Sequence, residues 1–390
     1  MIDSIVSLIC VFIVALWATA WIYRKVLIVA IEKNIMDNPD ARKIQRVPVP
    51  ILGGIAVYWG IIVALAAAGI ILNLSYLFEV GCIMTIMLMV GTLDDIISLS
   101  PRLRFLIEII AVLTLILANG YSINDFHGLW GVGVIPSWIS IPLTVFACVG
   151  IINSINLIDG VNGLSSGYCI ITSLICGVFF YLSGDMDSAA LAVASIGALL
   201  PFFLHNVFGK KSKMFIGDGG TLLMGVILSS FLINILKEGS YVASYVFDNF
   251  GLIPFTLAVF AIPIFDTLRV MSLRIIRGVS PFNPDKTHLH HLLLDLHFSH
   301  VGTTSIEILL NLFIVFSWWL SYKLGATIDV QLYLVIILGM GGTFGLYKFA
   351  RIHEAKGSDL YHKLIKIGDW THVGHTGWFE WLTKRLDKDC

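Results

Sequence analysis

Eleven long apolar stretches dominate this chain and decide what it can fold into. A helix needs roughly 20 mostly apolar residues to cross the hydrocarbon core of a bilayer. In water, 57% hydrophobic and 13% charged residues could not form one core with enough polar surface around it. We therefore predict an all-α polytopic membrane protein. The expected spans are residues 4–23, 51–72, 76–93, 105–118, 135–158, 164–184, 188–209, 219–236, 249–265, 304–322 and 330–347.

The positions of the basic residues predict how these helices are oriented. With the N-terminus outside, the inner segments hold 23 of the 25 Lys and Arg, and only Lys237 and Lys323 lie elsewhere. Cytoplasmic loops carry such an excess of positive charge. The stretch 105–118 is short and contains Glu108, but if it did not cross, Lys210 and its basic neighbours would face outward. We therefore predict eleven spans, an outer N-terminus that is not a cleaved signal peptide, and a cytoplasmic C-terminus.

Composition excludes several kinds of site. The net charge of −1 provides no basic field for nucleic acid. Five of the six cysteines lie in apolar stretches, and none forms a CxxC or Cys/His pattern, which argues against structural zinc or a disulfide framework. The chemistry therefore has to come from polar clusters at helix ends. Four such clusters all fall on the predicted inner side.

The first cluster is Asp94-Asp95, at the inner end of the third stretch. Adjacent carboxylates repel each other unless a cation or a shared proton compensates. Magnesium suits this arrangement, because it takes one or two carboxylates together with substrate phosphates. The alternative is a solvated pair of acids at a helix end.

The second cluster follows the fifth stretch. Asn153, Asn156 and Asp159 recur every three residues, so they share a face if the helix continues to its inner end. Gly160 and Gly163 then allow a tight turn or a close approach of the backbone to a ligand. Three polar side chains at the end of an uncharged run are hard to explain by packing, so we expect a functional site.

The third cluster is Asp218 with the glycines around it, at the start of the eighth stretch. An acid at a helix N-terminus could simply be the N-cap. Glycines beside it also suit a phosphate or metal site built on free backbone N–H groups. For this cluster alone, the N-cap interpretation is favoured.

The fourth cluster is His288, His290 and His291, beside Asp285 and Lys286 in the longest inner loop. Such a group can bind a diphosphate or a metal, although a polar solvated loop is the alternative. Zinc would recruit further His or Cys ligands, whereas the other inner clusters offer carboxylates. The four clusters together therefore favour magnesium and phosphate.

These clusters, with a Pro-rich entry to the second stretch, follow the order of the motifs of one known family. The chain resembles the polyprenyl-phosphate N-acetylhexosamine-1-phosphate transferases. Members of this family start wall teichoic acid, O-antigen and enterobacterial common antigen, and include the peptidoglycan translocase that makes lipid I. The matching stretches are Pro48 to Gly54, Gly91 to Asp95, Asn153 to Gly163, Ile216 to Thr221 and Pro281 to His291.

The resemblance implies a reaction at the inner leaflet of the cell membrane. The phosphate of undecaprenyl phosphate would attack the β-phosphorus of a cytoplasmic UDP-N-acetylhexosamine and release UMP. The product would initiate a cell-surface glycan such as the O-antigen of lipopolysaccharide. The resemblance also implies Mg²⁺, with Mn²⁺ as a substitute, and allows a homodimer.

Roles for individual residues follow from the same resemblance. The implied catalytic residues are Asp94, Asp95 and Asp159, and the implied magnesium ligands are Asp218, Asp159 and Asp95. The implied substrate-binding residues are Asn153, Asn156, His288, His290, His291 and Arg46. A phosphate monoester has a second pKa of about 6, so the lipid phosphate is already largely dianionic at neutral pH and has little need of a general base. Metal binding or positioning is therefore the favoured role for these aspartates.

The sequence departs from the family pattern at two places, and its eleventh span and inner tail look more like the branch of the family that uses simple UDP-HexNAc donors. Position 162 is Asn where many bacterial relatives have Asp, and the loop reads His-Leu-His-His rather than three consecutive histidines. We therefore expect UDP-GlcNAc or a related UDP-HexNAc as the donor, with UDP-MurNAc-pentapeptide as the alternative. A secondary transporter is the rival from another class, but transporters place their polar groups near the membrane midplane, often in inverted repeats.

We divide the chain into two parts. Residues 1–348 are expected to form a transmembrane catalytic domain with its site on the cytoplasmic face. Residues 349–390 are expected to form a cytoplasmic tail. The motif loops of the first part are 42–54, 91–104, 153–166, 209–221 and 266–302.

Overall fold

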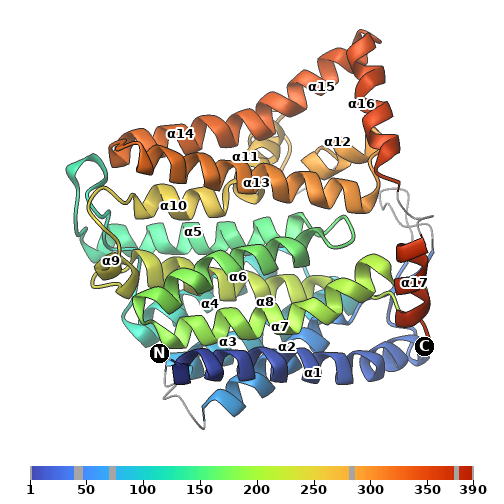
Figure 1. The fold of residues 1–390 in the computed structure, drawn as a ribbon, viewed down its shortest axis with the longest axis horizontal. Coiled ribbons are helices and arrows are strands. Elements are labelled where there is room, and N and C mark those ends of the chain that lie inside the picture. The colour runs from blue at the N-terminus through green and yellow to red at the C-terminus, as the bar shows by residue number, and fades with distance from the viewer. Residues whose placement is uncertain (1, 39–46, 70–75, 281–285, 373–376, 389–390) are drawn as a thin grey trace.

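The computed structural model describes residues 2–38, 47–69, 76–280, 286–372 and 377–388, and it is almost entirely helical (Figure 1). The helices of the first half are α1 (Ile2–Glu32), α2 (Gly53–Ala68), α3 (Tyr76–Ile97), α4 (Pro101–Asn119), α5 (Ser137–Leu157), α6 (Leu164–Ser183), α7 (Met186–Phe208) and α8 (Gly217–Leu236). They are followed by α9 (Tyr241–Tyr245), α10 (Leu252–Val259), α11 (Ala261–Ile276), α12 (Leu289–Asp295), α13 (His300–Lys323), α14 (Ile328–Met340), α15 (Leu346–Ala355), α16 (Asp359–Trp370) and α17 (Gly377–Leu386).

Few other elements interrupt this pattern. A π-helical turn, η2 (Gly341–Gly345), joins α14 to α15, and a short 3₁₀ helix, η1 (Leu129–Gly131), lies in the loop before α5. Two antiparallel strands of two residues each, β1 (Met36–Asp37) and β2 (Val49–Pro50), pair with Met36 opposite Pro50.

The described residues of all eleven predicted spans are largely helical, and the prediction of an all-α polytopic membrane protein is confirmed. Among the described residues, eight helices are long and apolar enough to cross a membrane, and a ninth crossing results if the bent pair α10 and α11 is one span. Helix α2 is shorter, with 16 residues. Helix α4 carries Arg102, Arg104 and Glu108, so its length alone does not identify it as a span.

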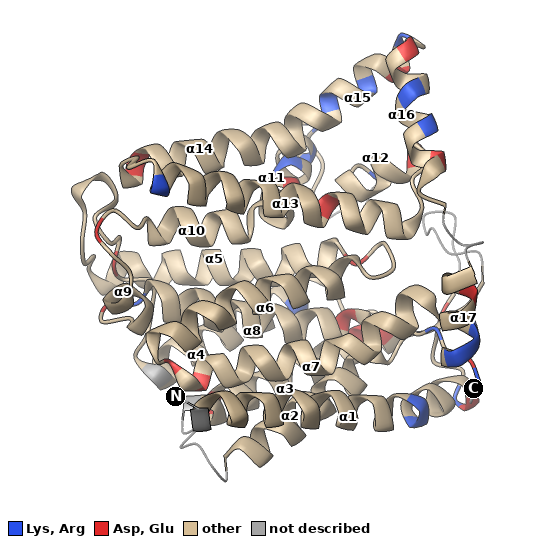
Figure 2. Ribbon diagram, viewed as in Figure 1, with Lys and Arg blue, Asp and Glu red and all other residues tan. Residues whose placement is uncertain are grey.

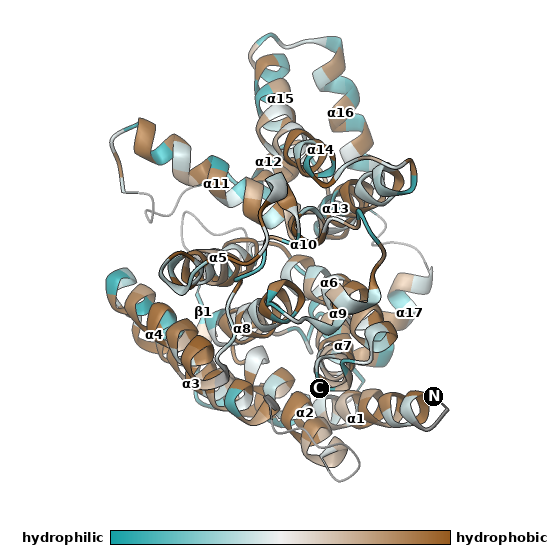
Figure 3. Cartoon of the chain, turned by 90° about the vertical axis from the view of Figure 1, so that its left-hand side faces the viewer, coloured by the Kyte–Doolittle hydropathy of each residue, from teal (hydrophilic) through white to brown (hydrophobic). Residues whose placement is uncertain are grey.

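The ninth predicted span, 249–265, is not one straight helix but is divided between α10 and α11. The chain bends by 74° between α10 and α11 at Phe260. Pro263 has no N–H with which to bond Val259 O. That carbonyl instead accepts bonds from Asn311 Nδ2 (3.0 Å) and Tyr168 Oη (2.5 Å), while Asn311 Oδ1 accepts from Ile262 N (3.0 Å). After the break, α11 runs outward from the other helices (Figure 3).

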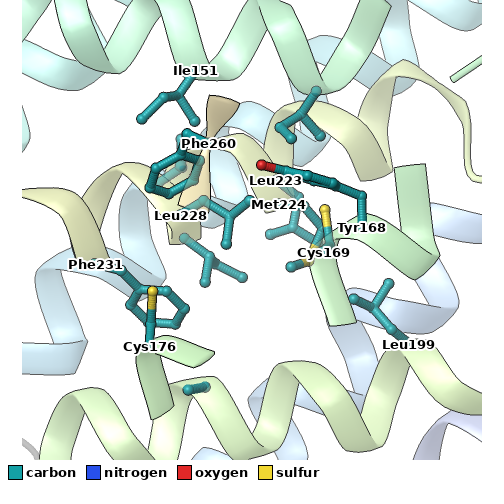
Figure 4. Close-up of a cluster of buried hydrophobic side chains, with 14 of the residues drawn as sticks. Ile151, Tyr168, Cys169, Cys176, Leu199, Leu223, Met224, Leu228, Phe231 and Phe260 are labelled. Atoms are coloured by element: carbon teal, nitrogen blue, oxygen red, sulfur yellow. The ribbon is translucent and has the colours of Figure 1, made fainter. Parts of the chain in front are cut away.

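Helix α8 lies at the centre of the molecule and is buried along its length. Apolar side chains from α5, α6, α7 and α8 meet there, together with Phe260 from the break between α10 and α11 (Figure 4). Three free cysteines, Cys148, Cys169 and Cys176, are buried in the protein, whereas Cys10 and Cys82 are exposed on the outer surface of α1 and α3.

The contact between α3 and α8 depends on glycine. A Cβ added to Gly91 would lie 2.4 Å from Asp218 C and from Gly219 N, both of which are backbone atoms that cannot move aside. Because of this, α3 approaches the start of α8 closely enough for Asp94 and Asp95 to reach it. The missing side chain therefore positions the first cluster beside the third.

We expect Gly91→Ala to destabilise the protein by about 1–3 kcal/mol, the usual range for overpacking a tight contact. The melting temperature of the purified protein in detergent measures this effect. Gly81→Ala is the matched control, because it lies on the same helix and a Cβ there would have nothing within 4 Å. Equal melting temperatures of the two variants would contradict the close contact.

Charged residues are concentrated at one end of the molecule. Figure 2 shows Lys and Arg gathered at the end that carries α15, α16, α17 and the C-terminus, while the middle of the helices is nearly free of charge. Lys237 directly follows α8, and Lys323 is the last residue of α13. We call the end that carries α15, α16 and α17 the basic end. The loops after α3, α5 and α7 belong to the same end.

Candidate active site

Three of the four predicted clusters meet where α3 and α5 end and α8 begins. Asp94 and Asp95 lie in the last turn of α3, Asn156 lies next to the last residue of α5, and Asp218 is the second residue of α8. Gly217 makes this possible because its φ is +71°, and a Cβ there would lie 2.4 Å from Asp95 Oδ2. We call Asp94, Asp95, Asn156 and Asp218 the carboxylate cluster.

Asp95 caps α8 from another helix. Its Oδ1 accepts a hydrogen bond from Asp218 N (3.0 Å), and its Oδ2 accepts one from Gly219 N (3.3 Å). These N–H groups are among those that have no partner within the helix. The alternative that Asp218 is itself the N-cap is therefore wrong. The Asp218 side chain is left to face the interior of the cluster.

Arg104 lies at the centre of the carboxylate cluster, and our sequence analysis did not identify it. Its Nη1 donates to Asp94 Oδ2 (3.1 Å) and Asp218 Oδ2 (3.0 Å). Its Nε donates to Glu108 Oε1 (3.1 Å), and its Nη2 donates to Asn156 Oδ1 (2.6 Å). The available signal was the pair of opposite charges four residues apart in an apolar helix. Such residues in membrane helices usually pair with one another.

The two asparagines of α5 share a face, as predicted. Asn156 Nδ2 donates to Asp218 Oδ1 (2.7 Å) and to Thr221 Oγ1 (2.8 Å). Asn153 Nδ2 donates to Glu108 Oε2 and to Val149 O. Through these bonds α5 fixes acidic side chains of both α8 and α4.

Asp159 does not continue this face, because α5 ends at Leu157 and the chain turns through residues 158–163. The prediction of a shared face for all three residues is wrong at this position. Asp159 Oδ1 instead accepts a hydrogen bond from Ser165 Oγ at the start of α6. Burial raises the pKa of Asp159 to about 7, a net effect that includes a lowering by the Ser165 bond and a smaller raising by the negative charge of Asp218. Asp159 is therefore electrostatically coupled to the carboxylate cluster.

The histidines form a second group, held by α11. His288 Nδ1 lies 2.8 Å from Asp266 Oδ2, and Asp266 Oδ1 accepts from Arg269 Nη2 (2.7 Å). The rings of His288 and His290 stack with centroids 5.6 Å apart, and those of His290 and His291 lie 4.4 Å apart. Asp266 and Arg269 were also missed by the sequence analysis, although their spacing of three residues in an apolar stretch was a usable signal.

Two ring nitrogens of this group are buried without a hydrogen-bond partner within the described ranges, namely His288 Nε2 and His290 Nδ1. Buried polar atoms are normally satisfied, so two neighbouring exceptions call for an explanation such as a ligand. Burial, with the nearby His291 and His288, lowers the pKa of His290 well below its usual value. The His290 ring is therefore neutral at physiological pH, so it offers one N–H donor and one acceptor.

The histidines contact the turn that carries Asp159. A Cβ added to Gly160 would lie 2.6 Å from His290 Nε2. Asp159 and Gly160 are adjacent, so the turn 158–163 connects the histidines with the carboxylate cluster. The four predicted clusters thus belong to one region. Arg46 and Asp285 lie outside the described residues.

We expect Gly160→Ala to displace the buried His290 ring and to lower turnover by about tenfold or more, since small misplacements in active sites carry costs of this size. The initial rate of UMP release at fixed donor concentration measures the effect. Gly150→Ala is the control, because it lies on α5 and a Cβ there meets nothing within 4 Å. If both variants have the wild-type rate, the contact between the turn and His290 has no bearing on turnover.

The oxygen donors of the carboxylate cluster suit a hard cation. Within the described part of the chain, no three His, Cys, Asp or Glu side chains are arranged as a complete metal site. Magnesium is usually held by one or two carboxylates together with substrate phosphates and water. The two carboxylates of Asp94 and Asp218, which both contact Arg104 Nη1, therefore fit the protein's share of a magnesium site.

Comparisons with known proteins agree with this picture. Residues 77–236 match the glycosyl transferase family 4 model, a range that contains Asp94, Asp95, Asn156 and Asp218. A probable undecaprenyl-phosphate N-acetylglucosaminyl 1-phosphate transferase of Bacillus subtilis is 30% identical over 345 residues, which cover 86% of this chain and 90% of that protein. Two further relatives, each 29% identical to this chain, are undecaprenyl-phosphate alpha-N-acetylglucosaminyl 1-phosphate transferases. The Escherichia coli O157:H7 match covers 70% of this chain and 72% of the relative, and the Yersinia pestis match covers 75% of this chain and 77% of the relative. The chain therefore belongs to the polyprenyl-phosphate N-acetylhexosamine-1-phosphate transferase family.

Proposed function

We propose that this protein transfers N-acetylglucosamine-1-phosphate from UDP-GlcNAc to undecaprenyl phosphate, releases UMP and so initiates a cell-surface glycan. The observation that carries this proposal is the convergence of Asp94, Asn156 and Asp218 on Arg104 at the ends of three apolar helices. The names of the relatives supply undecaprenyl phosphate and the N-acetylglucosamine 1-phosphate group, and the UDP-linked donor follows from the family resemblance. Residues 1–348 would form the catalytic domain and residues 349–390 a cytoplasmic tail.

We propose that the basic end lies in the cytoplasm and that α2 and α4 also cross the inner membrane, giving eleven spans with the N-terminus outside. The concentration of Lys and Arg at this end supports the orientation, because cytoplasmic segments are enriched in them. The carboxylate cluster faces the same end. It would therefore be reached by a cytoplasmic nucleotide sugar and by a lipid phosphate at the inner leaflet.

The proposed transfer is a displacement at phosphorus. An oxygen of undecaprenyl phosphate forms a bond to the β-phosphorus of the donor, and the bond from that phosphorus to the oxygen it shares with UMP breaks. The lipid phosphate has a second pKa of about 6 and is largely dianionic at neutral pH. The protein therefore has mainly to position the two phosphates and to balance their charge.

Residues of the site can be assigned to these two tasks. Asp94 and Asp218 would hold Mg²⁺, with Asp159 beside them, and Mn²⁺ would be able to replace Mg²⁺. The Asp94 carboxylate is itself held by Arg104 and by Leu99 N (2.7 Å). The ion would neutralise phosphate charge and stabilise the leaving group. Arg104 would add a fixed positive charge. The unpartnered nitrogens of His288 and His290 would bond the diphosphate of the donor.

Release of UMP by the purified protein tests the proposal. The protein in detergent receives undecaprenyl phosphate and one of several UDP-sugars, including UDP-MurNAc-pentapeptide, with magnesium or with EDTA. Magnesium-dependent release with UDP-GlcNAc supports the proposed reaction, and release only with the pentapeptide donor would assign the lipid I reaction instead. If the folded protein releases no UMP with any donor, while an active relative releases UMP under the same conditions, the proposal of a transfer reaction is wrong. Substrate transport would then be measured next.

A further inference from the structure

The C-terminal helix α17 packs on the end of α7 at the basic end. The ring of Phe208, the last residue of α7, lies 5.6 Å from that of Trp378 and 5.2 Å from that of Phe379. Thr383 Oγ1 donates to Phe208 O (2.9 Å), and the Thr383 side chain is buried. Apolar contact and a hydrogen bond thus fix α17 against the point at which α7 ends. The position of α17 in Figure 1 agrees with this.

Just beyond α17, the carboxylate of Asp387 binds the loop that follows α7. It accepts hydrogen bonds from Lys210 N (3.2 Å), Lys211 N (3.1 Å) and Ser212 N (3.0 Å), and one from Ser212 Oγ (2.8 Å). Successive N–H groups of this kind form a concave site for an anion. Partial burial would raise the pKa of Asp387, but the bonds from Ser212, Lys211 and Lys210 outweigh it and lower the pKa. Asp387 is therefore ionised at neutral pH.

The loop 209–216 leads directly into the carboxylate cluster. Tyr23 Oη donates to Ser212 O (2.8 Å), and Asn206 Nδ2 donates to Met214 O (2.9 Å). At its far end Phe215 N donates to Pro50 O (2.8 Å), after which Gly217 turns the chain into α8. Only five residues lie between Ser212 and Asp218. Any shift of the loop is therefore passed to Asp218 over a short and constrained path.

We infer that Asp387 is a positioning residue, and that α17 with Asp387 holds the loop 209–216 so that Asp218 is presented to the site in one geometry. This inference rests on the proposed function for its kinetic consequence. In this role Asp387 acts through the loop and not on the substrates. The contact of Asp387 with the loop links the last described residues of the chain to the carboxylate of Asp218, which is far away in the sequence.

Replacement of Asp387 by Ala tests this role through two measurements. Trypsin cleavage after Lys210 and Lys211 reports on the loop directly and needs no activity. We expect cleavage to become about tenfold faster or more, because several hydrogen bonds to a charged group are lost and the loop opens more often. We also expect kcat for UMP release to fall by about tenfold or more, with a smaller change in the KM for the UDP-sugar.

Glu380→Ala is the matched control, since Glu380 is exposed on α17 and its replacement removes the same charge. Asp387→Asn retains the shape and one acceptor oxygen, so it should recover part of the lost kcat. It also keeps the test decisive if Asp387→Ala does not fold. The melting temperature of each variant is measured so that kcat is counted per folded molecule.

The outcomes separate this inference from the proposed function. If the variants of Asp387 have the cleavage rate and the kcat of the wild type, the positioning role is overturned. If they melt at lower temperature but have unchanged kcat per folded molecule, Asp387 is merely structural and the inference is also overturned. If the wild type releases no UMP with any donor, the proposed function is wrong, and the trypsin measurement still decides whether Asp387 holds the loop.

Discussion

Replacement of Asp218 by Asn is expected to lower the rate of UMP release by about 10²-fold or more, the cost of removing one key electrostatic group from an active site. Both oxygens of Asp218 are engaged, one by Arg104 (3.0 Å) and the other by Asn156 (2.7 Å). An amide of the same shape has no charge and only one acceptor oxygen. The variant would therefore lose the charge that holds Arg104 and the proposed magnesium ion.

The fold of this variant should remain intact, because Arg104 keeps its bonds to Asp94 and Glu108. Rates are compared at saturating substrates, and the melting temperature in detergent shows whether the protein is folded. Asp248→Asn is the control, since Asp248 is exposed in the loop between α9 and α10 and has no contact with the carboxylate cluster among the described interactions. Near-wild-type turnover of Asp218→Asn would sink the assignment of Asp218 to the reaction.

Replacement of Arg104 by Ala is expected to reduce both activity and stability. Arg104 contacts Asp94, Asp218 and Glu108, so its loss leaves three carboxylates together without this cation. Breaking a buried ion pair from one side costs about 3–5 kcal/mol. We expect the lower end of this range, because the side chains of Arg104 and Asp218 are 16% and 32% exposed. The rate of UMP release should fall by about 10²-fold or more.

Two further variants make this second prediction specific. Arg104→Lys keeps the charge but lacks the planar fork that bonds several acceptors at once, so it should recover part of the stability and little of the activity. Arg102→Ala removes the same charge from an exposed position two residues earlier. Melting temperatures and rates of Arg104→Ala equal to those of Arg102→Ala would show that Arg104 does not organise the cluster.

Much of the fold could be predicted because apolar length is a local property of the sequence. The described residues of the apolar stretches are largely helical for this reason. The break at Phe260 could not be placed in the same way. Pro263 weakens the helix there, but the groups that satisfy the freed backbone come from Asn311 and Tyr168, which are distant in the sequence.

The candidate site was predictable to the extent that its residues stand at helix ends. Asp94, Asn156 and Asp218 could be grouped because their helices end on the same predicted side. The partners of these residues depend on how helices pack. Arg104 could be paired with Glu108 from spacing alone, but its bonds to α3, α5 and α8 required the tertiary structure. Asp387 is one of several acids in the tail, and nothing local distinguishes it.

The burial of α8 from Gly219 to Leu236 affects how its sequence can vary. This helix is surrounded by other helices and includes Ser229, which bonds Cys148 O, and Asn234, which bonds Ser188 Oγ (3.0 Å). Its side chains are thus selected for volume and for partners among neighbouring helices. The outer faces of α1 and α3 need only dissolve in lipid. A methyl group added to α8 should therefore matter more than an exchange of one large apolar residue for another on α1.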